Sequence, residues 1–212
     1  MENTLAMKYM TFIGILFGIQ ASLFSQSSYV ESTFMGERVK YQYTFFKAFE
    51  TTNLSFFNLT SIRTDYNLGR ISESYLIDNF LFYEIKRGVS LVTEIAWNQK
   101  GQSVAFGARY SYNKNNFRFD IFPSYRISDR KYLFTRILLE YQTPIGGRVA
   151  LYFRGQINYS TDFSSNGNLS NLYRLGLQYK NIRFGIGTPW FKALSTTSIK
   201  KELVGIFVGL SI

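Results

Sequence analysis

Residues 104–127 read VAFGARYSYNKNNFRFDIFPSYRI, and this stretch decides the fold. In its first half, 104–112, every second position is apolar, while the positions between them hold small and polar residues such as Arg109. After the polar run at 113–116 the same alternation resumes over 117–127. A period of two is the signature of a strand with one apolar and one polar face. The stretch therefore predicts two antiparallel strands joined by a tight turn.

The same alternation extends over most of the chain, and no segment beyond residue 40 shows helical periodicity. Ten segments are predicted as strands: 53–63, 74–85, 88–99, 103–114, 116–127, 132–144, 147–160, 171–180, 181–190 and 201–212. Residues 29–46 add two more strands in an alternative count of twelve. The chain is thus predicted to be all-β.

The predicted connections are of two kinds, which alternate along the chain. One end of the strands carries the mostly longer connections at 64–73, 100–102, 128–131, 161–170 and 191–200. The other end carries the short connections at 86–88, 113–116, 144–147 and the corner at 180–181. Long loops at one end and tight turns at the other are typical of bacterial outer-membrane barrels.

The apolar face has an order of its own. Aromatic residues gather toward the ends of the predicted strands: Tyr75, Tyr83, Trp97, Tyr112, Phe117, Tyr125, Tyr132, Tyr141, Tyr159, Tyr173, Tyr179 and Trp190. Apolar, mainly aliphatic residues lie nearer the middles, among them Leu91, Leu151 and Leu175. Two aromatic girdles around an apolar band are expected where a barrel crosses a membrane. We therefore predict an antiparallel up-and-down transmembrane β-barrel of ten strands, with a soluble periplasmic binding barrel as the alternative.

The first residues read as a secretion signal. Lys8 is followed by an apolar stretch at 10–17 and then by small and polar residues, a pattern typical of a signal peptide. Cleavage after Ser25 is expected. The predicted organisation is a signal peptide at 1–25, an N-terminal segment or first strands at 26–52, and the barrel at 53–212, which is directed to the bacterial outer membrane.

The last strand carries a resemblance to a known class. Its alternate residues are all apolar: Val204, Ile206, Val208, Leu210 and Ile212. With the signal peptide and the alternating segments, this resembles the small outer-membrane β-barrel proteins of bacteria, and the chain is similar to the narrow nucleoside-channel barrels. The resemblance implies insertion by the barrel-assembly machinery among outer-membrane lipids and lipopolysaccharide. The class usually ends in an aromatic residue, whereas this chain ends in isoleucine.

Composition excludes much catalytic chemistry. The 212 residues include 24 Lys and Arg against 14 Asp and Glu, a net charge of +10, and no histidine or cysteine. Histidine bases, thiol nucleophiles, disulfides and His or Cys metal sites are therefore excluded. We expect no enzyme activity, no cofactor and no metal. Because the basic residues alternate along many strands instead of forming one patch, nucleic acid is not an expected partner.

The polar face is predicted to line the lumen. Its candidate residues, which form either a channel lining or a salt-bridge network, are Asp78, Glu84, Glu94, Arg109, Arg118, Asp120, Arg126, Arg136, Glu140, Arg154, Arg174 and Arg183. Lys180 is assigned to the same face. The excess of arginine favours a small porin-like channel for a hydrophilic or anionic solute. The alternative is a closed structural barrel that serves as an adhesin or as an accessory subunit of a larger outer-membrane complex.

Overall fold

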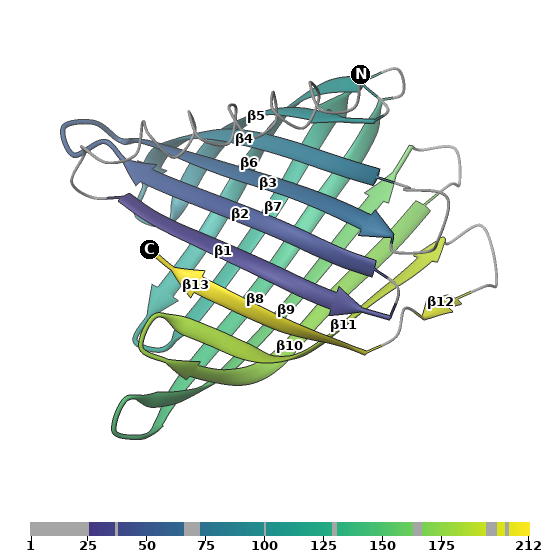
Figure 1. The fold of residues 1–212 in the computed structure, drawn as a ribbon. Helices are drawn as coiled ribbons and strands as arrows, with labels where there is room; N and C mark the ends of the chain where they lie inside the picture. Colours follow the sequence, from purple (N-terminus) through teal and green to yellow (C-terminus); the bar gives the residue numbers. More distant parts are fainter. Residues whose placement is uncertain are drawn as a thin grey trace, which may run out of the picture.

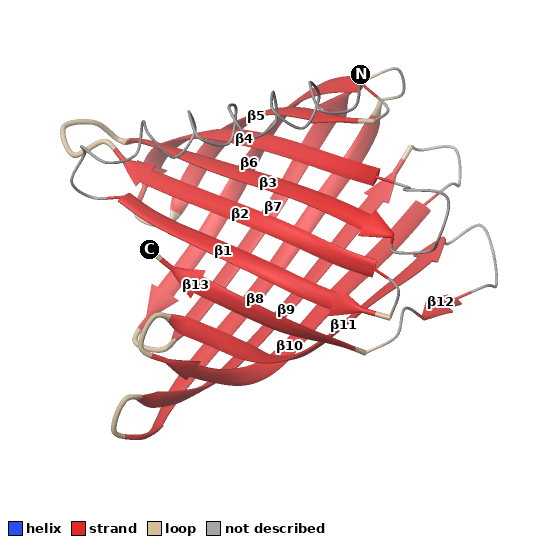
Figure 2. Cartoon of the chain, in the orientation of Figure 1, coloured by secondary structure: helices blue, strands red, loops and turns tan. Residues whose placement is uncertain are grey.

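The computed structural model is a closed antiparallel β-barrel (Figure 1). It describes residues 26–36, 38–65, 73–99, 101–128, 131–162, 167–193, 199–201 and 204–212. Strands and their connections make up this described part (Figure 2). The predicted signal peptide lies outside it. No helix in these ranges is long and apolar enough to cross a membrane.

Twelve strands form the wall. They are β1 (Gln26–Met35), β2 (Arg38–Ala48), β3 (Leu54–Asp65), β4 (Glu73–Lys86), β5 (Val89–Asn98), β6 (Gly101–Lys114), β7 (Phe117–Ile127), β8 (Tyr132–Gly146), β9 (Val149–Thr161), β10 (Gly167–Tyr179), β11 (Ile182–Ala193) and a last strand in two parts, β12 (Ile199–Lys201) and β13 (Gly205–Ser211). Each strand from β1 to β11 pairs with the next, and β13 pairs with both β11 and β1. The ring is therefore complete.

The predicted count of ten strands was wrong, and the alternative of twelve is confirmed. The two additional strands are β1 and β2, which cover the residues left out of the first count. The alternation of β2 is blurred because Phe45 and Phe46 are adjacent and face opposite sides. The two strands close the wall: Tyr29 pairs with Ser211, and the Ile212 amide donates to the Ser28 carbonyl oxygen at 2.9 Å. Without them β3 and β13 would be unpaired edges.

An even number of strands places both chain ends on one side of the barrel. On that side β4 and β5, β6 and β7, β8 and β9, and β10 and β11 are joined by two residues each. Asn115, Gly88, Gly147 and Lys180 have positive φ in these turns, as tight hairpins require. We call this side the short-turn end and the opposite side the long-loop end. Lys180 therefore lies in a turn, and its assignment to the polar wall was wrong.

The outer wall is apolar and banded. Tyr75, Trp97, Tyr125 and Tyr159 are exposed near the long-loop end of their strands, and Tyr83, Tyr112, Tyr141 and Tyr179 near the short-turn end. Between them Leu91, Phe106 and Leu175 are exposed. Such a surface fits a lipid environment. Tyr132 does not belong to the girdle, because its hydroxyl accepts a hydrogen bond from Arg126 at 3.4 Å inside the barrel. The side chain of Trp190 lies outside the described residues.

Part of the inner wall is closely packed. Tyr152, Gly176, Gly185 and Phe207 lie side by side in register across β9, β10, β11 and β13. The rings of Tyr152 and Phe207 contact each other at 6.1 Å between centroids. They meet because the two glycines between them have no side chains to occupy the inner face. Aromatic packing over glycine thus fixes this part of the wall.

Candidate functional site

The predicted lumen residues lie on the inner face of the wall. Their strand positions alternate with the exposed apolar residues. Ion pairs join them across neighbouring and distant strands. The pairs are Arg109–Asp120, Arg118–Asp120, Arg126–Glu94, Arg136–Asp78, Arg174–Glu31 and Arg183–Glu140. Glu84 instead accepts a hydrogen bond from the Gly88 amide at 3.0 Å. Most of the predicted residues are thus brought together in pairs.

A cavity opens at the short-turn end of the lumen. Its volume is about 720 Å³, and its lining runs from the ends of β1, β2 and β3 to residues such as Arg136 and Gln156 deeper in the barrel. Five arginines and three acids line it: Arg109, Arg118, Arg136, Arg154, Arg183, Glu84, Asp120 and Glu140. The charged side chains of the described lining therefore have an excess of two positive charges, five minus three. We call this space the short-turn cavity.

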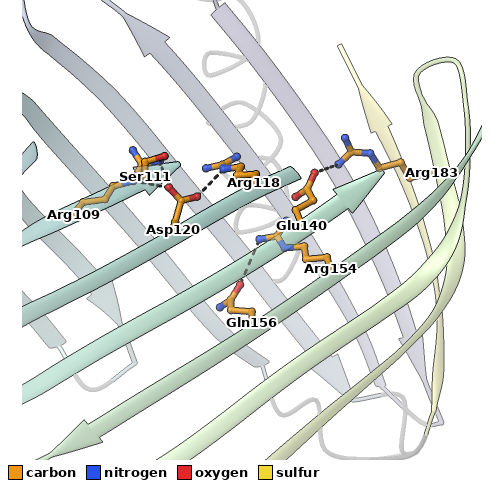
Figure 3. A network of polar contacts seen from close by, with 8 residues as sticks. All are labelled: Arg109, Ser111, Arg118, Asp120, Glu140, Arg154, Gln156 and Arg183. Atoms are coloured by element: carbon orange, nitrogen blue, oxygen red, sulfur yellow. Dashed lines mark hydrogen bonds and ion pairs between the residues drawn. The ribbon is translucent and has the colours of Figure 1, made fainter. Parts of the chain in front are cut away.

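Three of the five arginines are held by carboxylates at close range. Arg109 Nε and Arg118 Nε donate to Asp120 at 3.0 and 2.6 Å, so one carboxylate binds two guanidinium groups (Figure 3). Arg183 Nη1 lies 3.4 Å from Glu140 Oε1, which joins β11 to β8 across the intervening strands (Figure 3). Charge-assisted contacts of this kind fix side chains in one geometry. These arginines therefore form a rigid part of the lining.

Arg154 has weaker partners. Its Nη2 donates to Gln156 Oε1 at 3.4 Å (Figure 3), and its Nε is buried without a hydrogen-bond partner in the described residues. The chain of contacts continues from Gln156 Nε2 to Asn158 Oδ1 at 3.1 Å, and Arg136 Nε donates to the same oxygen at 3.2 Å. Two guanidinium groups are thus joined through amide side chains instead of a carboxylate. Glu140 on β8 is the register partner of Arg154, but its carboxylate is paired with Arg183. An anion entering the cavity would therefore find in Arg154 a guanidinium group that no carboxylate of the described residues holds by a direct hydrogen bond.

Beyond the cavity, toward the long-loop end, lies a layer of buried charge. It consists of Arg174–Glu31, Arg126–Glu94 and Arg136–Asp78, which we call the ion-pair belt. The side chains of Arg174 and Glu31 are each 1% exposed. Tyr29 and Thr33 donate further hydrogen bonds to Glu31 at 2.9 and 3.1 Å. Of the belt residues only Arg136 lines the cavity.

Contacts between non-adjacent strands narrow the lumen at the belt. Arg136 on β8 lies 3.9 Å from Asp78 on β4, and its guanidinium is 5.7 Å from the centre of the Phe80 ring. Phe80 also contacts Phe122 on β7, at 5.8 Å between centroids. Because three strands separate β4 from β8 in the wall, these side chains reach across the interior. The belt is therefore a constriction.

Sequence reasoning missed several inner-face residues. Glu31 was overlooked because β1 was not among the ten strands counted, although the alternation of polar residues at 29, 31 and 33 was a usable signal. Phe46 and Phe57 line the cavity but had been assigned no role. Each belongs to a pair of phenylalanines that are adjacent in sequence. In such a pair the two-residue period does not indicate which ring points inward.

The described residues contain no group of three or more His, Cys, Asp or Glu that could hold a metal ion. Most acids of the lumen are paired with arginines instead, as in Arg109–Asp120 and Arg183–Glu140. The chemistry available to this lining is recognition of anions and of hydrogen-bonding groups.

Comparison with protein-family models found no match, and no curated protein matched either. Among solved structures, the chain is similar to the KdgM porin, with a TM-score of 0.54 and 11% identity over 87% of this chain and 97% of that one. It is also similar to the KdgM porin in complex with disordered oligogalacturonate, with a TM-score of 0.52 and 10% identity over 87% and 97%. The chain therefore has the fold of the small bacterial outer-membrane β-barrel proteins.

Proposed function

We propose that the protein is an outer-membrane channel for small anionic solutes. The observation that carries this proposal is the lining of the short-turn cavity, where five arginines face three acids. A cleft of one charge sign with walls of low dielectric constant concentrates ions of the opposite sign. The planar guanidinium group binds carboxylates through two parallel hydrogen bonds and keeps its charge when partly desolvated. The lumen therefore favours anions over cations.

The fold supports the same proposal. A structural neighbour is a porin whose complex contains oligogalacturonate, a polyanion. In this proposal the signal peptide at 1–25 is cleaved, the barrel-assembly machinery inserts the chain, and the apolar outer wall meets lipid and lipopolysaccharide. The twelve predicted lumen residues then line the solute path, with the ion-pair belt as its narrowest section.

The test is single-channel conductance of the refolded protein in a planar bilayer. In a KCl gradient the reversal potential should show preference for chloride, and Arg154→Glu should reduce or reverse that preference. Arg154 is the residue to change because it donates to the amide of Gln156, and its register partner Glu140 is paired with Arg183. Arg148→Glu is the matched control: it makes the same charge change in the exposed turn between β8 and β9, outside the cavity lining. Equal effects of the two substitutions, or a cation preference in the unchanged protein, would contradict the proposal.

A closed structural barrel is the second candidate, and the ion-pair belt favours it. Arg174 and Glu31 are almost fully buried, as expected of side chains that fill an interior. In that case the protein would insert and fold yet give no conductance steps. It would then act as an adhesin or as an accessory subunit, and a partner should co-purify with it from the outer membrane.

A further inference from the structure

The short-turn cavity has one apolar wall. Phe46 on β2 and Phe57 on β3 are paired in register, line the cavity, and are only partly buried. Leu59, two residues further along β3, lines it too. Beside them Phe80 on β4, the register partner of Phe57, also lines the cavity, and its ring lies 5.7 Å from that of Phe57. The lumen of a water-filled barrel is normally polar, so phenylalanine rings that face the cavity call for an explanation.

The opposite wall carries the weakly paired arginine. In the ring of twelve strands, β9 is six strands away from β3 in either direction, so the two strands face each other across the lumen. From β9, Arg154 and Gln156 line the same cavity as Phe46 and Phe57. The cavity is therefore amphipathic, with the rings of β2 and β3 facing guanidinium and amide donors on β9, although Phe122 on β7 and Leu138 on β8 also line it.

We infer that this cavity binds a carboxylate attached to an apolar body, such as an aromatic ring or an acyl chain. The carboxylate lies against Arg154 and Gln156, and the apolar body covers Phe46 and Phe57. A cavity of about 720 Å³ has the size of a site for a small organic molecule. The inference deepens the proposed function, on which it rests, by naming the class of anion.

A sugar acid fits this arrangement less well. Its carboxylate would satisfy Arg154, but its hydroxylated body would remove less apolar surface of Phe46 and Phe57 from water than an apolar body of the same size. Acetate has the carboxylate and no body to cover the rings. Benzoate and octanoate have both, and removing their apolar surface and that of the rings from water adds to the affinity.

The experiment measures binding of four sodium salts to the refolded protein by calorimetry, at constant ionic strength. Benzoate or octanoate should bind roughly tenfold more tightly than acetate, and galacturonate should resemble acetate. If benzoate binds more tightly than octanoate, the apolar body is aromatic; if octanoate binds more tightly, it is an acyl chain. Equal affinity for all four salts, or the tightest binding by galacturonate, would overturn the inference.

Two adjacent pairs of phenylalanines supply matched variants. Phe46→Ala with Phe57→Ala removes the inward rings, and the affinity for benzoate or octanoate should fall to that for acetate. Phe45→Ala with Phe56→Ala removes the neighbouring outward rings, which contact each other at 6.2 Å, and should leave the ranking unchanged. An unchanged preference in the inward variant refutes the inference. If that variant does not fold, Phe46→Ser alone replaces it, and the ranking of salts by the unchanged protein still decides.

The two proposals fail separately. Chloride preference in KCl without any preference for apolar carboxylates would keep the channel and refute the inference. Tight binding of benzoate or octanoate by a protein that gives no conductance would refute the channel and keep the binding site. Arg154→Gln should weaken the binding of every carboxylate that binds, because it removes the positive charge that each of them contacts.

Discussion

Replacing Arg174 by methionine removes one half of a fully buried ion pair while keeping most of the side-chain volume. Its partner Glu31 would remain 1% exposed without its closest counter-charge, and the longer-range charges of Lys40 and Arg154 would remain. Breaking a buried pair in this way costs about 3–5 kcal/mol. The hydroxyl groups of Tyr29 and Thr33 still donate to Glu31, which places the expected loss near the lower limit, about 3 kcal/mol. That loss lowers the equilibrium constant for folding roughly 150-fold.

The assay is urea unfolding in lipid vesicles, followed by the fluorescence of the tryptophans. Arg118→Met is the control: the Arg118 side chain is 45% exposed, so loss of its ion pair with Asp120 should cost less than about 1 kcal/mol. Adding Glu31→Gln to Arg174→Met should recover part of the lost stability, because the uncompensated charge is gone. A loss at Arg174 no larger than at Arg118 would refute the view that the belt pair is buried and paired.

Three further predictions concern the outer wall, the packing of the inner wall and the electrostatic field inside the lumen. Ile186→Arg, in the apolar band of β11, should destabilise the inserted barrel by about 2–4 kcal/mol. Ile182→Arg, at the short-turn end of the same face, should cost about 1 kcal/mol or less. Equal losses of stability in the vesicle assay would contradict the banded outer wall. Gly185→Val should cost about 1–3 kcal/mol, because a Cβ there would overlap the Leu175 carbonyl oxygen; an unchanged urea midpoint would exclude this packing. The anion preference that depends on Arg154 should shrink between 0.1 and 1 M KCl as the Debye length falls from about 10 to about 3 Å, and a reversal potential that keeps its full anion preference in high salt would require a different origin of selectivity.

The fold was largely predictable because one period governs most of the chain. Where the inner face is polar and the outer face apolar, as over 104–127, the strands β6 and β7 begin and end within a few residues of the predicted bounds. The prediction failed where both faces are apolar. On β2 the adjacent Phe45 and Phe46 hide the alternation, so the strand was left out of the count of ten.

Pairing across the lumen was beyond the reach of sequence reasoning. The alternation assigned Arg136 and Arg183 to the inner face. Their partners, Asp78 and Glu140, lie on strands that are at least three positions away around the ring. Which acid pairs with which arginine depends on the register and curvature of the closed wall. Neither quantity can be derived from the sequence of a single strand. The buried pair of Arg174 and Glu31 is an example. Arg174 was predicted as a lumen residue, whereas Glu31 was not.

The distribution of charge along the lumen separates two tasks that the arginines share. In the belt, Arg174 and Glu31 are too deeply buried to exchange partners with a solute at low cost, so this pair contributes to holding the interior together. In the cavity, Arg154 donates to an amide and retains an unsatisfied donor, and its register partner Glu140 is paired with Arg183. A carboxylate can therefore bind Arg154 without first breaking a direct ion pair. Arginine count alone therefore says little about affinity in such a barrel. Arg154, which donates to an amide and lies opposite Phe46 and Phe57, is therefore the arginine that we expect to contact a ligand.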